Sequence, residues 1–228
     1  MSEQLTFTNA QSVSSKKYAL NIVIPMKGVQ RAKQRLKHVL SVSQRETLAL
    51  TLYTNTLRFV TEHYSQYELL VVTDDEHIAS FARKFGAKVL REPQGALGLN
   101  AALKRATQWS LARGFDHQLI MPADIGELDK RELDAVIEAG FCGHDVVIAR
   151  AKDLGTNALM TTPPDAIHPC FGARSALTHA KLAEQQSHRV AQLDLEKLSL
   201  DIDVSSDLAR WSMPLSSQAL NTKEMCHE

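Results

Sequence analysis

The chain has 228 residues, with 26 Lys and Arg balanced by 26 Asp and Glu, and 44% of its residues are hydrophobic. This composition is ordinary for a globular protein, and without a basic excess it argues against non-specific binding to nucleic acid or to an anionic membrane. No run approaches the roughly 18 apolar residues of a membrane-spanning helix. The three cysteines lack the C-x-x-C spacing of a zinc or redox site. We therefore expect a soluble, cytoplasmic protein.

The hydrophobic pattern alternates between short apolar runs and segments with helical periodicity. Strands are expected at 20–25, 69–74, 87–90, 117–121 and 145–149. Helices are expected from the capping-box spacing at 43–46 to Val60, at 78–85, from Leu99 to Gly114, at 130–139 closed by Gly140, and at 173–185. Extended segments at 190–195 and 200–203 and a short helix capped at 205–207 complete the chain. The alternation predicts a doubly wound α/β fold with a central, mostly parallel sheet.

The two ends of the chain differ in composition from its middle. The first twenty residues are polar and contain no apolar core followed by a cleavage site, and the residues after Trp211 are rich in Ser, Gln, Asn, Lys and Glu. No linker or repeat divides the remainder. We therefore predict a flexible N-terminal tail over residues 1–17, one domain over 18–213 and a flexible C-terminal tail over 214–228.

The connection after the first strand carries a cluster of positive charge. Four cations, Lys27, Arg31, Lys33 and Arg35, fall within the nine positions 27–35 that follow the strand. Because ligands of open α/β sheets bind outside the carboxyl ends of the strands, this cluster is suited to a polyphosphate and to a pyrophosphate leaving group. The alternative is the solvated basic face of an ordinary helix. Neither the P-loop pattern nor the dinucleotide-binding G-x-G-x-x-G pattern is present.

Carboxylates follow two other apolar segments. Asp124 comes directly after the strand at 117–121, and Asp201 and Asp203 alternate with Leu200 and Ile202, so both carboxylates point to one face. Neighbouring like charges repel unless a cation neutralises them, and Mg²⁺ binds through one or two carboxylates together with substrate phosphates. The three aspartates therefore form a candidate Mg²⁺ site. The alternative is a set of solvated strand-end aspartates.

Two further segments could present hydrogen-bond donors to an acid. Thr156 and Asn157 follow Gly155, and Gly172 precedes Ser175 in a loop that opens a helix. Free backbone amides at a helix N-terminus favour a carboxylate or a phosphate. Each segment also has the composition of an ordinary turn or N-cap, and the residues alone leave this alternative open.

Taken in order over residues 20–208, these segments resemble the 2-phospho-L-lactate guanylyltransferase family of deazaflavin coenzyme F-420 biosynthesis. The resemblance rests on Pro25-x-Lys27, Ala32-Lys33-x-Arg35-Leu36, Val72-Thr73-Asp74, Gly98-Leu99-Asn100-x-Ala102-Leu103, Pro122-Ala123-Asp124, Gly155-Thr156-Asn157-Ala158-Leu159, Phe171-Gly172-x-x-Ser175 with His179, and Leu200-Asp201-Ile202-Asp203 before Asp207-Leu208. Each motif is weak by itself, and the ordered set is specific.

The resemblance implies a single-domain, Rossmann-like nucleotidyltransferase fold and a Mg²⁺-dependent guanylyltransferase. GMP from GTP would be joined to 2-phospho-L-lactate, phosphoenolpyruvate or 3-phospho-D-glycerate, with release of pyrophosphate. It implies Mg²⁺ on Asp124, Asp201 and Asp203, with Asp124, Lys27 and Lys33 as catalytic residues. It implies nucleotide contacts from Pro25, Lys27, Lys33, Arg35, Thr73, Gly98 and Asn100, and acid contacts from Thr156, Gly172 and Ser175.

The sequence departs from the family pattern at one position and leaves several alternatives open. The family usually has a second proline two residues after the aspartate, where this chain has Gly126. We expect the glycine to relax that turn, which puts acid specificity in more doubt than metal binding. The alternatives are a nucleotidyltransferase with another acceptor, such as a molybdopterin or a sugar phosphate, and a non-catalytic nucleotide-binding protein. Whether the protein is a homodimer also stays open.

Overall fold

The computed structural model describes residues 19–92 and 98–211. The predicted tails, 1–17 and 214–228, lie outside the described residues, as do 93–97. The strands are β1 (Leu20–Pro25), β2 (Glu68–Thr73), β3 (Lys88–Arg91), β4 (His117–Ile120), β5 (Val146–Arg150), β6 (Thr156–Thr161) and β7 (Val190–Leu193). The α-helices are α1 (Val42–His63), α2 (Glu76–Lys84), α3 (Leu99–Ala112), α4 (Lys130–Phe141), α5 (Ser175–Gln185) and α6 (Ser205–Arg210), and two 3-10 turns are η1 (Val29–Arg31) and η2 (Gln34–Leu36).

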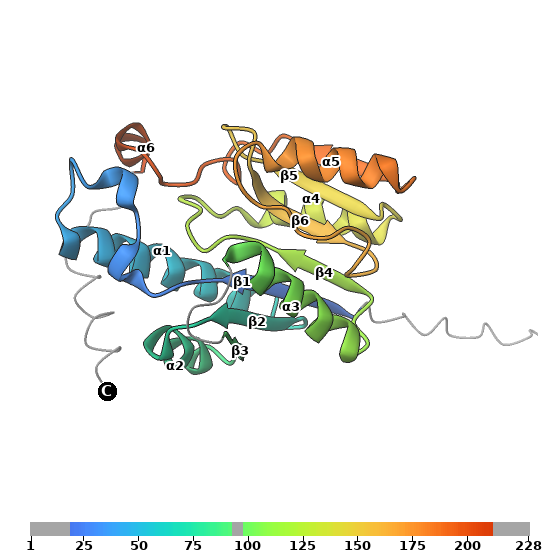
Figure 1. The fold of residues 1–228 in the computed structure, drawn as a ribbon, viewed down its shortest axis with the longest axis horizontal. Coiled ribbons are helices and arrows are strands. Elements are labelled where there is room, and N and C mark those ends of the chain that lie inside the picture. Colours follow the sequence, from blue (N-terminus) through green and yellow to red (C-terminus); the bar gives the residue numbers. More distant parts are fainter. Residues whose placement is uncertain (1–18, 93–97, 212–228) are drawn as a thin grey trace, which may run out of the picture.

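The strands form one seven-stranded sheet in the order β3-β2-β1-β4-β6-β5-β7 (Figure 1). β6 is antiparallel to both of its neighbours, and the other pairs are parallel. The predicted mostly parallel α/β sheet is therefore confirmed. β6 itself is absent from the sequence prediction, because its six residues are buried without alternation and lie between Gly155 and a Pro-rich segment. That composition is typical of a turn.

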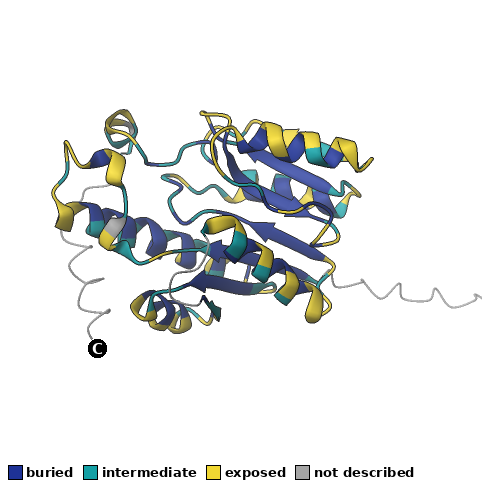
Figure 2. Ribbon diagram, in the orientation of Figure 1, coloured by how far each residue is buried: buried dark blue, intermediate teal, exposed yellow. Residues whose placement is uncertain are grey.

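Helices cover both faces of the sheet. α1, α2 and α4 share one core cluster with the β1 residues Ile22 and Ile24, whereas α3 packs on Val23 from the opposite face. α5 packs beside Ile148 and Leu159 at the other end of the sheet. Figure 2 shows the strands buried and the outer helix surfaces exposed. The carboxyl end of β1, at Pro25, lines a cavity.

Most helix boundaries differ from the sequence prediction by one to three residues, and at two of them the predicted end signal has another role. The capping box lies two residues earlier than predicted, because Ser41 Oγ accepts from Gln44 N at 3.3 Å and Gln44 Oε1 accepts from Ser41 N at 2.8 Å. The α4 helix also continues past Gly140, to Phe141. A Cβ at position 140 would lie 2.5 Å from Cε of Met160 on β6. Gly140 permits close packing on β6 and does not end the helix.

Candidate active site

Two loops at the carboxyl edge of the sheet are joined by backbone hydrogen bonds. Gly126 N donates to Leu200 O at 2.8 Å, and Ile202 N donates to Asp124 O at 3.2 Å. Ile125 and Asp201 form the antiparallel bridge between these hydrogen bonds. The two predicted carboxylate motifs, far apart in the chain at Asp124 and Asp201, are therefore held side by side.

Gly126 makes this close approach possible. A Cβ at this position would lie 2.5 Å from Ile202 Cδ1 and 2.9 Å from Ile202 Cγ1, closer than two carbon atoms can approach without movement. The sequence predicts that this glycine relaxes the turn, whereas in the structure it allows close packing against Ile202. Gly126 brings the loop that carries Asp124 against the segment that carries Asp201 and Asp203.

Lys33 links the two carboxylate loops to the basic segment after β1. Its backbone is left-handed, with φ 50°, and its side chain is 5% exposed. Its Nζ lies 2.6 Å from Asp124 Oδ2 and 3.2 Å from Asp203 Oδ1, and Arg35 Nη1 lies 3.3 Å from Asp203 Oδ2. Burial by itself would lower the pKa of Lys33, but the two carboxylates outweigh it and raise the pKa, so the ammonium stays charged.

Three carboxylates, those of Asp124, Asp201 and Asp203, form a cluster with the Lys33 ammonium. Burial raises the pKa of Asp201, and the charges of Asp124 and Asp203 raise it further. Over 19–92 and 98–211, no three acidic, His or Cys side chains converge closely enough to hold a metal ion as they stand. The Lys33 ammonium occupies the position between two of the carboxylates. A place that holds one cation between carboxylates fits Mg²⁺, which prefers hard oxygen ligands.

A cavity of about 370 Å³ opens beside the cluster. Its lining includes Lys27, Lys33, Asp124, Asp203 and the α3 residue Leu99. Pro25 lines it as well. The size lies within the range of ordinary small-molecule sites. The basic segment also contains Arg31, whose side chain is not among those that the structure describes.

The other predicted nucleotide residues lie near the carboxyl edge. Thr73 ends β2, and its Oγ1 accepts from Asp75 N at 3.1 Å. Gly98 caps α3. The Asn100 amide is paired with the backbone of Phe171, since Nδ2 donates to Phe171 O at 2.9 Å and Oδ1 accepts from Phe171 N at 2.7 Å. Asn100 therefore joins the start of α3 to the loop before α5, and nucleotide contact by these residues stays a prediction.

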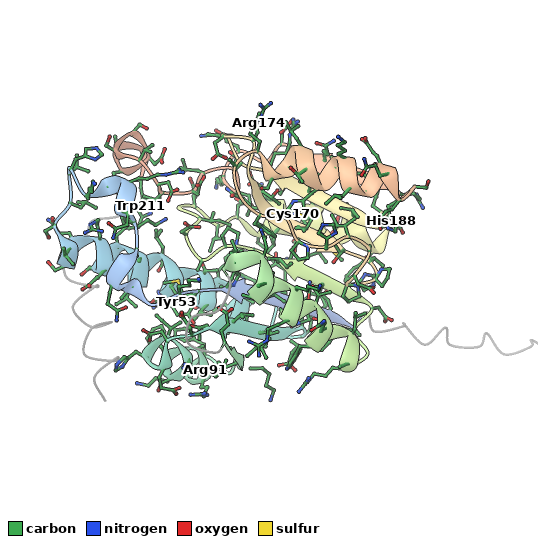
Figure 3. All side chains as sticks on the ribbon, viewed as in Figure 1. Tyr53, Arg91, Cys170, Arg174, His188 and Trp211 are labelled. Atoms are coloured by element: carbon green, nitrogen blue, oxygen red, sulfur yellow. The ribbon has the colours of Figure 1, made fainter. Side chains whose placement is uncertain are left out.

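The three predicted acid-binding residues come together at the start of α5. Ser175 Oγ donates to Thr156 Oγ1 at 3.0 Å, and Ser175 N donates to Gly172 O at 3.1 Å. Gly172 has φ +148°, a conformation that other residues rarely adopt. His179 lies on the next turn of α5, with Nδ1 3.0 Å from Thr156 Oγ1. Figure 3 labels Cys170 in the loop that leads to this group.

Glu132, a residue outside every predicted motif, anchors the segment that carries Asp201 and Asp203. The Glu132 carboxylate accepts from the backbone N–H groups of Lys197, at 3.1 Å to each oxygen, and of Leu198, at 2.7 Å. Asn157 Nδ2 donates to Leu198 O at 2.9 Å, so its amide is used for this anchor. No local pattern could reveal Glu132, because its partners lie 65 and 66 residues further along the chain.

The strand order and the helices on both faces of the sheet form a Rossmann-like α/β fold, which solved nucleotidyltransferases share. The fold is similar to that of a protein from Desulfovibrio desulfuricans described as a nucleotide-diphospho-sugar transferase, with TM-score 0.70, 16% identity, and coverage of 91% of this chain and 95% of that one. It is also similar to a cytidylyltransferase from Leptospira borgpetersenii, with TM-score 0.55, 14% identity, and coverage of 92% and 94%.

The chain belongs to the family described as guanylyl transferase CofC like, whose model matches residues 20–223. It is 41% identical to a 3-phospho-D-glycerate guanylyltransferase of Colwellia psychrerythraea, over 90% of this chain and 97% of the relative. It is 33% identical to a phosphoenolpyruvate guanylyltransferase of Sphaerobacter thermophilus, over 82% and 89%. It is also 33% identical to a 2-phospho-L-lactate guanylyltransferase of Methanothermobacter thermautotrophicus, over 82% and 81%. The protein is therefore a nucleotidyltransferase of the guanylyltransferase family.

No helix in the described part of the chain has the length and apolar character to span a membrane.

Proposed function

We propose that the protein transfers GMP from GTP to the phosphate of a small three-carbon acid, as a step toward deazaflavin coenzyme F-420. The observation that carries the proposal is the convergence of Lys33, Asp124 and Asp203 on one cavity. Leu99 of α3 also lines this cavity, and its neighbour Asn100 binds the backbone of Phe171, just before Gly172. Among the three acids of the relatives, 3-phospho-D-glycerate is the preferred acceptor, because the 41% identical relative is named for it.

The reaction needs positioning and charge neutralisation and no covalent nucleophile. An oxygen of the acid's phosphate attacks the α-phosphorus of GTP while the bond from that phosphorus to the α,β-bridging oxygen breaks. Pyrophosphate leaves with the electron pair of that bond. Lys27, Lys33 and Arg35 neutralise the triphosphate and the leaving group, and Pro25, Thr73, Gly98 and Asn100 contribute to the nucleotide site.

Asp124, Asp201 and Asp203 would hold Mg²⁺. When bound, the ion supplies positive charge that neutralises phosphate oxygens without a proton transfer. The Lys33 ammonium, 2.6 Å from Asp124, is then free to pair with a phosphate oxygen. The backbone hydrogen bonds between the two carboxylate loops hold the three aspartates close together before any ligand binds.

The acid is proposed to bind at the start of α5. Thr156 and Ser175 offer hydroxyl groups, and the Gly172 segment offers backbone N–H groups at a helix N-terminus, where an anion is favoured. Asn100 fixes this segment against α3, and Leu99, its neighbour, lines the cavity. We also propose a cytoplasmic location, in which the free thiols of Cys142 and Cys170 stay reduced.

Pyrophosphate release tests this function. The enzyme is given Mg²⁺ with GTP or ATP, and 3-phospho-D-glycerate, phosphoenolpyruvate and 2-phospho-L-lactate are supplied singly. We expect acid-dependent release with GTP, with the highest kcat/KM for 3-phospho-D-glycerate, and release with ATP lower by about tenfold or more. Release that does not depend on any of the acids, or none at all, would contradict the proposal and favour another acceptor.

A further inference from the structure

We propose that His179 is a positioning residue that makes the Thr156 hydroxyl a committed hydrogen-bond donor toward the anionic acceptor substrate. The inference rests on the proposed function, because it deepens the role of the acid-binding group at the start of α5. His179 is fully buried and hydrogen-bonds Thr156, whose Oγ1 also accepts from Ser175, so it acts on substrate only through these residues.

The backbone fixes the tautomer of His179. The Cys170 N–H donates to His179 Nε2 at 2.9 Å, so Nε2 must carry a lone pair and no hydrogen. In a neutral imidazole the hydrogen then lies on Nδ1, the atom 3.0 Å from Thr156 Oγ1. Nδ1 is therefore the donor and the Thr156 hydroxyl is the acceptor in this pair.

The second acceptor position of the Thr156 hydroxyl is filled as well. Ser175 Oγ donates to the same Oγ1 at 3.0 Å. A hydroxyl oxygen has two acceptor lone pairs and one hydrogen. With both lone pairs engaged, Thr156 can interact with a further group only by donating its hydrogen. Within residues 19–92 and 98–211, no hydrogen bond from that hydroxyl to an acceptor is found.

Burial keeps the imidazole in this one state. It lowers the pKa of His179 to about 4, with a smaller contribution from His168, so the ring is neutral at physiological pH. The Phe171 ring packs edge-on against it, with the centroids 5.1 Å apart. A protonated ring would bring an Nε2 hydrogen against the Cys170 N–H, which is also a donor. The arrangement is compatible only with the neutral ring.

The same imidazole holds both parts of the acid site. Its Nε2 fixes the backbone at Cys170, two residues before Gly172, and its Nδ1 orients Thr156 on β6. Successive hydrogen bonds polarise one another, so the chain from Cys170 N–H through His179 strengthens the final Thr156 donor. A group that only accepts hydrogen bonds, such as a carboxylate or phosphate oxygen, matches this donor best.

Two replacements of His179 separate its two hydrogen bonds. In His179→Asn, the amide nitrogen lies near the position of Nδ1 and keeps the donor to Thr156, while the acceptor for Cys170 is lost. In His179→Gln, the amide oxygen lies near the position of Nε2 and keeps the acceptor for Cys170, while the donor to Thr156 is lost. Thr156→Val removes the hydroxyl, and Thr161→Val is the matched control, a buried threonine on the same strand whose hydroxyl donates to Pro164 O.

Initial rates of pyrophosphate release give KM for the acid and for GTP in each variant. We expect His179→Gln and Thr156→Val each to raise the acid KM by about tenfold or more, with the GTP KM within about twofold of wild type. Thr161→Val should keep the acid KM within about threefold, and His179→Asn, which keeps the donor to Thr156 but loses the acceptor for Cys170, should raise it less than His179→Gln does. In the Thr156→Val background, His179→Gln should add less than about twofold, because the group it orients is gone.

An equal rise of the acid KM in His179→Asn and His179→Gln would overturn the proposal, as would full additivity with Thr156→Val. Nitrogen NMR of the wild-type imidazole provides a readout independent of turnover. Protonation at Nδ1 supports the proposal, and protonation at Nε2 overturns it. If wild-type enzyme shows no acid-dependent release, the proposed function fails, and the NMR result still decides whether Thr156 is a committed donor.

Discussion

At the scale of single residues, Lys33 is the centre of the site. Its buried ammonium joins Asp124 and Asp203, and its left-handed backbone directs the side chain from the β1 connection into the carboxylate pair. The sequence predicts cations after β1 and carboxylates at Asp124 and Asp203. It could not predict which of the four cations pairs with them, because that depends on how three loops meet in space.

Lys33→Met tests this role. Loss of the ammonium leaves Asp124, Asp201 and Asp203 to repel one another, so the melting temperature should fall at neutral pH in the absence of a divalent cation. Added Mg²⁺ should recover more of the melting temperature in the variant than it adds to wild type. Turnover should fall by about a hundredfold or more, since the proposed contact with the triphosphate is lost.

Lys37→Met, at an exposed lysine four residues further on, is the matched control and should change neither property. Thermal unfolding with and without Mg²⁺ gives the first result, and pyrophosphate release gives the second. A Lys33→Met enzyme with wild-type turnover would show that this lysine only fills space between the aspartates.

At the scale of elements, the site depends on loops held at the carboxyl edge of the sheet. Strands and helices with clear periodicity are predictable, and with them the mostly parallel α/β class, whereas the order of the strands is not. β6 is not predictable, because α4 packs on one of its faces and α5 on the other, so all six residues are buried and the sequence shows no alternation. The hydrogen bonds from the backbone of the 197–203 segment to Glu132 cannot be predicted from the sequence either, because only the folded chain brings these distant residues together.

Gly126→Ala tests the junction between the two carboxylate loops. The added Cβ would meet Ile202 Cδ1 at 2.5 Å, so Ile202 must move and separate Asp203 from Asp124. We expect a loss of about 1–3 kcal/mol in the free energy of unfolding. We also expect the Mg²⁺ concentration for half-maximal turnover to rise by about tenfold, because the predicted metal ligands no longer meet.

Ile202→Val removes the atom nearest to the added Cβ and serves as the compensating change. Placed on Gly126→Ala, it should restore part of both the stability and the Mg²⁺ response. Denaturant unfolding and metal titration of turnover measure the two effects. A Gly126→Ala enzyme with wild-type stability and metal response would mean that the loops adjust freely and that their close approach is incidental.

At the scale of the whole molecule, buried His179 makes stability depend on pH. Its pKa is about 4 in the folded protein and near 6.5 in an unfolded chain, so the unfolded state binds the proton first as pH falls. The stability contributed by the neutral ring is present above pH 6.5 and is lost as pH falls from about 6.5 toward 4. The full loss is about 3 kcal/mol.

Denaturant unfolding between pH 7 and 5 checks this expectation in a window above the titration of ordinary carboxylates. The free energy of unfolding of wild type should decline across the window, and His179→Gln should decline less, because it has no imidazole to protonate. Equal slopes for the two proteins would contradict the assignment of this pH dependence to His179.

The central claim is that the carboxylate cluster beside the cavity is the site of guanylyl transfer. Acid-dependent pyrophosphate release by Asp124→Asn, measured with GTP and Mg²⁺ beside wild type, tests it most directly. The replacement keeps the shape of the side chain and removes its charge, so turnover should fall by about a hundredfold or more while the fold survives. Wild-type release by a folded Asp124→Asn enzyme would contradict the claim.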